Sequence, residues 1–474
     1  MIIYLNNFNN NDFGNLDIGI GDFKREVMKA NYQKQTGLLL SYENAMEDLK
    51  ELMKDEITER MEQAAILQKK LKDVNIVKKD KEYLRKEKKE YEKMIKECIA
   101  KNSIRVKNYE GEKINQFIQE MVGEFVGYSV LEDAFADPSI TDIYVIDWET
   151  IFVEKNGVNE RYHKNFRSPK HFENVLKRFL SEAGKEINIG DSKIVDFELY
   201  QDRGCAISPA VSPRGYSLTI RKHSEDHIVR EQLIKYKVMD EKMSDLLGML
   251  IIGECNLICG GNTGSGKTTT IRALLDYYVT KANKRMIVCE DTQELFPQNE
   301  HTLELVSVKS DDKNLAIPLQ NLIYTALRLK PKYIVVGEVR AEEAEAAVEG
   351  METGHSTIFT MHGGVPINII NRLVTKYLMA MPTLSIDVVE RIIGSAVDYI
   401  FIQHNIPGIG RKITTLTEVN YNFETRRVEL IDICTFDFET ETWIWHNKLG
   451  KDKIDKMLRR GIPYKELKPW IRKY

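Results

Sequence analysis

The spacing of apolar side chains predicts a long helical region near the start of the chain. No glycine lies between Gly37 and Gly111, and the first proline is Pro138, so residues 38–110 contain no strong helix breaker. Apolar side chains recur there at steps of three or four, which places them along one stripe of a helix. They are Leu49, Met53, Ile57, Met61, Ala64, Leu67, Leu71, Val74 and Val77, followed by Leu84, Tyr91, Ile95 and Cys98. One long helix or a helical hairpin is expected.

Charged residues dominate the same region. From Glu43 to Glu110 there are 16 acidic and 18 basic residues, with the mixed signs typical of the wet face of a coiled coil. Residues 1–112 are therefore expected to form a charged helical arm. It is either a solvated hairpin packed on its own protein or a docking arm for a partner.

The pattern then changes to that of a small α/β domain, expected over residues 113–222. Residues 131–157 alternate apolar and polar side chains around a turn, as strands do, and residues 171–184 have the spacing of an amphipathic helix that ends at a glycine. The charged stretch 223–240 is predicted to be a linker.

Short apolar strands alternate with helical segments over residues 241–420, which predicts a parallel sheet with helices on both faces. Residues 421–474 are expected to hold further strands and a basic helical tail. From His446 onward there are 10 basic and 3 acidic residues. Such a tail is expected either to meet anionic lipid or an acidic partner, or to be a solvated helical end.

The overall composition narrows the class of protein. No run among the 474 residues approaches the roughly 18 apolar residues of a membrane span, and the start lacks the features of a secretory signal, so a cytoplasmic protein is expected. The net charge of -4 predicts no polyanion partner. The six cysteines form no CxxC pair and are expected to be buried or incidental thiols.

A phosphate-binding loop is the strongest chemical signal. GNTGSGKT, Gly261 to Thr268, fits G-x-x-x-x-G-K-[ST] and lies between the strand-like CNLIC and the helical TTTIRALLDYY. Its glycines let backbone N–H groups converge on phosphate oxygens, and the following helix adds the positive end of its dipole. Lys267 is expected to reach the β and γ phosphates of ATP, and Thr268 to ligate Mg²⁺. The predicted contact residues are Gly261, Asn262, Thr263, Gly264, Ser265, Gly266, Lys267, Thr268 and Thr269.

Carboxylates that orient a metal and polarise water are expected at the ends of neighbouring strands. Glu290 and Asp291 follow one strand-like run. Glu338 follows another, with Arg340 two residues on, and Gly337 stands where a Walker B motif usually has its aspartate.

Two histidines, His355 and His362, flank the strand-like STIFTM. His362 follows the strand, where an imidazole could sense the γ phosphate. Metal binding by the pair is not expected, because a spacing of seven across a strand points the two rings to opposite faces.

GNTGSGKT, EDTQEL, GEVR and TGH followed by TMH, in this order, resemble the type II/type IV secretion ATPases, the hexameric motors of pilus assembly, conjugation and protein export. ITDIYV, SPRGYSLTIRKH and RKITTLTEV are most similar to the Tad-type pilus and secretion ATPases and their archaellum-motor relatives. The seven-residue histidine spacing departs from the Tad type and is similar to the archaellum and type II branch. The resemblance covers roughly residues 115–440 and does not include the arm.

This resemblance implies an α/β fold in which a RecA-like P-loop ATPase domain follows a small α/β domain. It further implies a homo-hexamer, a membrane platform protein as partner, and peripheral association with the inner face of the membrane through partners. Glu338 is similar to the catalytic glutamate, and Glu290 to an acidic residue that helps hold Mg²⁺. Three arginines match those that reach the phosphates, often from a neighbouring subunit: Arg203, Arg214 and Arg221. Arg340 and His362 complete the candidate catalytic set, and Thr268, Glu290 and Glu338 are the candidate Mg²⁺ ligands.

Three other functions share parts of these motifs. A RecA-type nucleic-acid-dependent ATPase would need basic loops with interleaved aromatics, which the motor region lacks, so no direct nucleic-acid binding is expected. A small-molecule P-loop kinase would leave the histidine segment without a role. A non-hydrolysing scaffold is separated from a motor by an assay of phosphate release.

Overall fold

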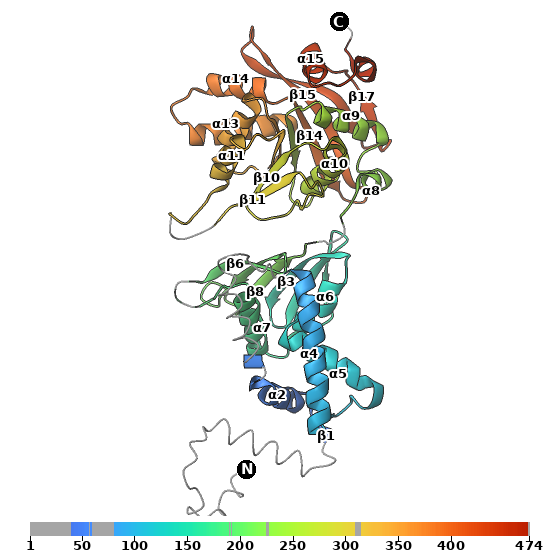
Figure 1. Cartoon of the computed structure of the whole chain (residues 1–474), viewed down its shortest axis with the longest axis vertical. Helices are drawn as coiled ribbons and strands as arrows, with labels where there is room; N and C mark the ends of the chain where they lie inside the picture. The colour runs from blue at the N-terminus through green and yellow to red at the C-terminus, as the bar shows by residue number, and fades with distance from the viewer. Residues whose placement is uncertain are drawn as a thin grey trace, which may run out of the picture. The chain divides into compact units, whose positions relative to one another are not determined.

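A computed structural model describes residues 39–58 and 80–472, apart from residues 56, 189, 191, 224–226 and 309–313. The chain divides into two compact units, Met1–Ser224 and Glu225–Tyr474 (Figure 1). Each unit has its own sheet and its own hydrophobic core.

The described part of the arm contains two separate helices. Helix α2 spans Tyr42–Leu52, and helix α4 spans Lys81–Asn102. The side chain of Asp80 caps the start of α4, so one continuous helix over 38–110 is excluded. Of the predicted stripe, Leu84, Tyr91 and Ile95 are buried, whereas its members from Met61 to Val77 lie outside the described residues.

These helices pack with α5 (Ile114–Phe125) into one apolar cluster. Leu49 of α2, Ile95 of α4 and Phe117 of α5 are all fully buried in it. A two-stranded parallel sheet, β1 (Leu39–Leu40) with β2 (Arg105–Val106), joins the segment before α2 to the segment after α4. The described arm therefore packs on its own protein, and the boundary predicted at residue 112 falls inside this cluster.

A six-stranded antiparallel sheet follows, in the order β5-β4-β3-β8-β7-β6. The apolar face of α7 (Pro169–Glu182) is buried in the core of this sheet. The strands are β3 (Ile140–Asp147), β4 (Thr150–Lys155), β5 (Val158–Arg161), β6 (Ile194–Leu199), β7 (Asp202–Ile207) and β8 (Ser217–Arg221).

The second unit is built on a nine-stranded sheet in the order β11-β10-β12-β13-β9-β14-β15-β16-β17. The run from β11 to β14 is parallel, and β14 to β17 pair antiparallel. The strands are β9 (Leu257–Gly261), β10 (Met286–Glu290), β11 (Thr302–Val306), β12 (Tyr333–Val336), β13 (Ser356–His362), β14 (Tyr399–Ile406), β15 (Gly410–Asn422), β16 (Arg427–Asp437) and β17 (Thr442–Trp445).

Helices cover both faces of this sheet (Figure 1). Successive strand residues point to opposite faces, and Leu257 and Cys259 accordingly join one core while Ile258 joins the other. The predicted α/β class with a helix-covered parallel sheet is confirmed. The helices are α9 (Glu241–Ile252), α10 (Lys267–Ala282), α11 (Leu319–Leu327), α12 (Glu343–Glu352), α13 (Pro366–Ala380) and α14 (Ile386–Ala396).

The stretch predicted as a linker, 223–240, is partly folded into the second unit. It contains α8 (Arg230–Lys235), and Leu233 and Met239 are buried in the core of the second unit. Arg230 donates to Ser244 Oγ at 2.7 Å and lies over the ring of Tyr277. The charged residues that suggested a linker thus anchor the start of the second unit.

The basic tail is also part of the second unit. Helices α15 (Lys451–Arg459) and α16 (Tyr464–Leu467) bury Ile454, Met457 and Leu467 in its core. Lys453 pairs with the buried Asp398 at 2.9 Å. The described tail therefore packs on the second unit through its apolar face and this lysine, whereas Lys451, Arg459, Lys465 and Lys468 are exposed.

All six cysteines are free thiols, and four of them are buried, as expected. Within the described residues, no helix combines the length and the hydropathy needed to cross a membrane.

Candidate nucleotide-binding site

The predicted phosphate loop connects β9 to α10. Gly266 has φ 91° directly before the helix, a conformation that side-chain-bearing residues rarely adopt. A Cβ at Gly261 would lie 2.2 Å from the backbone oxygen of Gln403 on the neighbouring strand β14. Glycine is thus required at position 266 by a left-handed backbone conformation and at position 261 by the close approach of two strands.

Lys267 begins α10 and is almost fully buried beneath the loop. Its Nζ donates to the carbonyl oxygens of Gly261 and Asn262, each at 3.0 Å. Burial lowers the pKa of this ammonium group. Thr268 and Thr269 follow half-buried in the first turn of the helix, so the loop, the lysine and the helix N-terminus face one place.

Glu290 ends β10, which β12 and β13 separate from the loop strand β9 in the sheet, and it is 2% exposed. Its Oε1 accepts from the backbone N–H groups of Glu294 and Leu295 at 3.1 and 3.2 Å. Burial raises the pKa of this carboxyl to about 8. A Cβ at Gly337 would lie 2.9 Å from Glu290 Cγ, which explains why glycine replaces the usual aspartate there.

The side chain of Glu338 contacts those of two other predicted site residues, Arg340 and His362. Arg340 Nε donates to its Oε2 at 2.7 Å, and His362 Nε2 lies 2.7 Å from its Oε1. His362 stands opposite Gly261 in the β13–β9 register, which brings this group to the start of the phosphate loop. Burial lowers the pKa of His362, although the charge of Glu338 opposes this. His355, at the other end of β13, bonds the carbonyl of Pro331 and is not part of the site.

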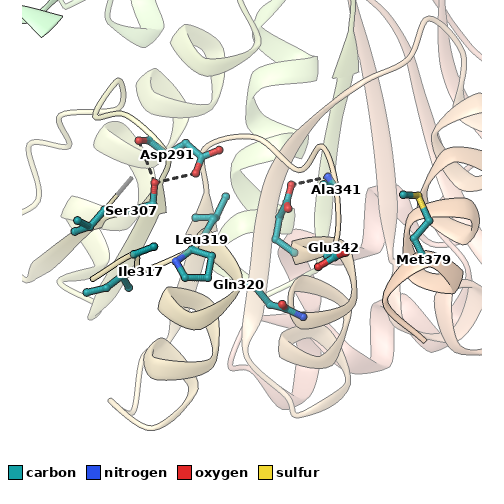
Figure 2. Close-up of a pocket in the computed structure, with 12 residues that line it drawn as sticks. Asp291, Ser307, Ile317, Leu319, Gln320, Ala341, Glu342 and Met379 are labelled. Atoms are coloured by element: carbon teal, nitrogen blue, oxygen red, sulfur yellow. Dashed lines mark hydrogen bonds between the residues drawn. The ribbon is translucent and has the colours of Figure 1, made fainter. Parts of the chain in front are cut away.

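Asp291 lies on a neighbouring cavity of about 470 Å³ (Figure 2). It accepts from Ser307 Oγ at 2.9 Å. Apolar and acidic side chains line the cavity, among them Ile317, Leu319, Glu342 and Met379. Asp291 thus lines this cavity whereas Glu290 is buried, so the two acids at the end of β10 have different surroundings.

Two residues that contact the loop were missed by the sequence analysis. Gln403 Nε2 donates to the carbonyl of Ser265 at 2.7 Å, and Arg411 Nε donates to that of Gly264 at 3.2 Å. They lie on β14 and β15, about 140 residues after the loop; Arg411 begins the run RKITTLTEV, whereas Gln403 belongs to none of the motifs. The pairing of β14 with β9 and of β15 with β14 brings them to the loop, so no local signal could have identified Gln403.

The three predicted arginines belong to the first unit. Arg221 on β8 pairs with Asp142 at 3.0 Å. Arg214 pairs with Asp147 and donates to Thr150 Oγ1 at 3.1 Å. Arg203 stands opposite Arg221 in the β7–β8 register, so two of the three lie side by side on one sheet.

The loop fits an anionic ligand with a hard cation. Ser265 Oγ and Thr270 Oγ1 are buried and have no hydrogen-bond partner within the described part of the chain. The Lys267 ammonium is held by loop carbonyls that a phosphate could replace. The oxygens of Thr268 and Glu290 are the donor type that Mg²⁺ prefers.

Comparison with known proteins identifies the family. Residues 127–412 match the family model described as type II/IV secretion system protein. An uncharacterized protein of Methanocaldococcus jannaschii is 31% identical over 285 residues, which are 58% of this chain and 49% of that protein, about half its length. The conjugal transfer protein TrbB of Rhizobium radiobacter is 29% identical over 232 residues, 48% of this chain and 68% of that protein.

Solved structures give related matches. The VirB11 ATPase of the Brucella suis type IV secretion system is 23% identical, covering 60% of this chain and 91% of that one, with a TM-score of 0.33. The pilus retraction motor PilT with bound ADP is 20% identical, covering 64% and 82%, with a TM-score of 0.44. Because the family model matches more than half of the sequence, the chain belongs to the type II/IV secretion ATPase superfamily.

Proposed function

We propose that this chain is an ATP-hydrolysing hexameric motor that powers assembly or translocation in a pilus, type II secretion or conjugative type IV secretion system. The observation that carries the proposal is the convergence of Lys267, Glu338 and His362 at the end of β9 and β13. Membership of the secretion family and similarity to a conjugal transfer protein support the machine class.

In this proposal the phosphate loop binds the β and γ phosphates of ATP through its N–H groups and Lys267. Thr268 and Glu290 would hold Mg²⁺, with Glu338 as the third candidate ligand; a bound Mg²⁺ neutralises charge on the phosphate oxygens. Asn262, Thr263 and Gly264 are the exposed part of the loop and would contact the nucleotide from outside.

Glu338 would act as the base that orients water for attack on the γ phosphate. Arg340 and His362 lie at its two oxygens and fix the direction of the carboxylate. His362 lies between Glu338 and the loop, so it would also sense whether the γ phosphate is present. Contacts of Lys267, Arg221 and His362 with the γ phosphate would be lost on hydrolysis, and that difference would drive the mechanical step.

In the proposed ring, Arg203, Arg214 and Arg221 would reach the phosphates from a neighbouring subunit. A positive charge on a transferring phosphoryl group increases its rate by about 10³ to 10⁵. Arg221 would have to exchange Asp142 for phosphate. The ring would act at the inner face of the membrane, recruited by a platform protein, without direct nucleic-acid binding.

Phosphate release by purified full-length Lys267→Ala tests the proposal. We expect no turnover above background, because the loop loses the group that neutralises the phosphates. Lys281→Ala is the matched control, since this exposed lysine lies on the same helix and contacts the ring of Tyr277. Wild-type rates in Lys267→Ala would contradict the site. Mass photometry with and without ATP tests the hexamer, and DNA-stimulated turnover would favour the nucleic-acid-dependent alternative.

A further inference from the structure

We propose that Gln403 is a positioning residue of the phosphate loop, which fixes the peptide planes that bind nucleotide phosphate. The inference rests on the proposed nucleotide function. Gln403 is 1% exposed, and its Nε2 donates to the carbonyl of Ser265 at 2.7 Å, inside the loop. The amide therefore makes a short, buried bond to the backbone of the loop.

A strand irregularity directs this side chain at the loop. Gln403 stands opposite Gly261 in the parallel β14–β9 pair, and the register of β14 with β15 shifts between Ile402 and Gln403. Such a bulge changes the direction of the side chains beside it. A Cβ at Gly266 would lie 3.0 Å from Gln403 Nε2, so the loop itself leaves room for this amide.

The direction of the Ser265 carbonyl decides the direction of the next N–H group. In a planar trans peptide the C=O and N–H bonds point to opposite sides. Because Gln403 holds the Ser265 carbonyl, the N–H group of Gly266 is turned the other way, and Arg411 acts likewise on the Gly264 carbonyl and the Ser265 N–H group. Ser265 N now donates to Asn262 O at 3.3 Å, within the loop. Carbonyl oxygens would repel a phosphate, whereas N–H groups bind it.

A second buried amide in the same sheet shows what a purely structural side chain looks like. Asn256 precedes β9, at the opposite end of that strand from the loop. Its Nδ2 donates to Ala396 O at 2.7 Å, and its Oδ1 accepts from Thr357 N at 3.0 Å. Gln403 Oε1, in contrast, is buried and has no hydrogen-bond partner within the described residues. Gln403 thus donates a hydrogen bond to the loop, although its own buried acceptor, Oε1, has no partner within the described residues.

The test compares two variants of the full-length protein, each of which replaces a buried amide side chain by an apolar one of similar size. Gln403→Met removes the donor and keeps the volume, and Asn256→Leu does the same at the other end of the strand. ADP affinity is measured by isothermal titration calorimetry, and KM and kcat for ATP by phosphate release. We expect Gln403→Met to bind ADP and ATP roughly tenfold more weakly with kcat within about twofold, because the loop binds ground and transition states alike. Asn256→Leu should lower the melting temperature without changing KM.

The outcomes separate this inference from the proposed function. If the wild type binds ADP, Lys267→Ala does not, and folded Gln403→Met binds as the wild type does, the positioning role is wrong and the function stands. An equal loss of affinity in Asn256→Leu would also overturn it, because the effect would then be general destabilisation. If the wild type binds no nucleotide, the proposed function fails first. Should Gln403→Met not fold, Gln403→Asn is read in the same way, since its amide is one methylene too short to reach Ser265.

Discussion

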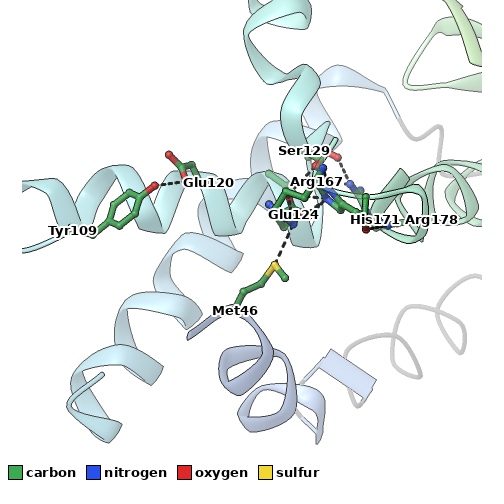
Figure 3. A network of polar contacts seen from close by, with 11 residues as sticks. Met46, Tyr109, Glu120, Glu124, Ser129, Arg167, His171 and Arg178 are labelled. Atoms are coloured by element: carbon green, nitrogen blue, oxygen red, sulfur yellow. Dashed lines mark hydrogen bonds and ion pairs between the residues drawn. The ribbon is translucent and has the colours of Figure 1, made fainter. Parts of the chain in front are cut away.

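Glu124 of α5 and Glu290 of β10 are both buried carboxylates, one in each unit, and they differ in what surrounds them. The Glu124 side chain is 5% exposed and lies among cationic and polar groups from α7 and the segments before it (Figure 3). His171 Nε2 lies 2.9 Å from its Oε2, Arg167 Nη2 lies 3.1 Å from its Oε1, and Ser129 Oγ donates at 2.8 Å. Burial alone would raise the pKa of Glu124, but these partners lower it to about 2.

Glu290 is buried to a similar degree, and its hydrogen bonds come from backbone N–H groups. Burial therefore dominates and raises its pKa to about 8. In the first unit, the partners of Glu124 thus compensate its charge, and these contacts join the helices of that unit. At Glu290 of the second unit, burial keeps the pKa raised, a perturbation that functional sites often show.

The largest expected effect on activity is that of Glu338→Gln. A glutamine cannot take a proton from water, so turnover should fall by about 10² to 10⁴. ATP should still bind and remain trapped, which rapid filtration with labelled nucleotide detects. Glu342→Gln, an exposed glutamate four residues on, is the control. Normal hydrolysis by Glu338→Gln would remove Glu338 from the proposed role.

Glu290→Gln should lower the Mg²⁺-dependent rate by about 10- to 100-fold, the usual cost of losing a group that supports a metal site. It should not destabilise the fold. The folded pKa of Glu290 lies above its unfolded value, so the wild type loses stability as the pH rises from about 4.5 through 8, and the amide removes this loss. Scanning calorimetry without nucleotide at pH 6 and pH 8 measures it. A lower melting temperature for Glu290→Gln than for the wild type would contradict the difference between Glu290 and Glu124 argued above.

Glu124→Gln should have the opposite profile, with turnover kept and stability lost. Removing one partner of a buried ion pair costs about 3 to 5 kcal/mol, because the charge of Arg167 is left uncompensated and His171 loses its carboxylate partner. Urea unfolding followed by circular dichroism gives the free energy, with Glu120→Gln on the same helix as control. A loss of turnover equal to that of Glu290→Gln would show that the two acids do not differ as argued.

The acid dependence of unfolding provides a finer test. The folded pKa of Glu124 is about 2, below the unfolded value of 4.5, so its contribution is fully present above pH 4.5 and is lost as the pH falls toward 2. Glu124→Gln should therefore flatten the stability of the first unit between pH 5 and pH 3. An unchanged slope would mean that other carboxylates carry the acid sensitivity.

How much of the site could be predicted from the sequence depended on whether its residues form a contiguous motif or are brought together only by strand pairing. Lys267 and the loop glycines form one contiguous motif, and Glu290, Glu338 and His362 each end an apolar strand, so their placement follows from strand ends meeting at one sheet edge. Gln403 required a strand pairing and a bulge that no pattern reveals. Charge counting could not show that Lys453 of the basic tail pairs with the buried Asp398, 55 residues earlier. Charge counting could not find the cluster around Glu124 either, because the partners Arg167 and His171 are distant from Glu124 in the sequence.

The smallest expected effect comes from an ion pair on the surface of α4. Lys96 Nζ lies 2.6 Å from Glu92 Oε1, closer than His171 lies to Glu124. Distance alone would make it the stronger pair. Water screens it, however, and both long side chains lose freedom on pairing, so Lys96→Gln should cost about 0.5 kcal/mol or less, and less still at high salt. Urea unfolding in low and high salt measures this. A cost as large as that of Glu124→Gln would mean that proximity, and not burial, sets the strength of these pairs, and the contrast between Glu124 and Glu290 would lose its physical basis.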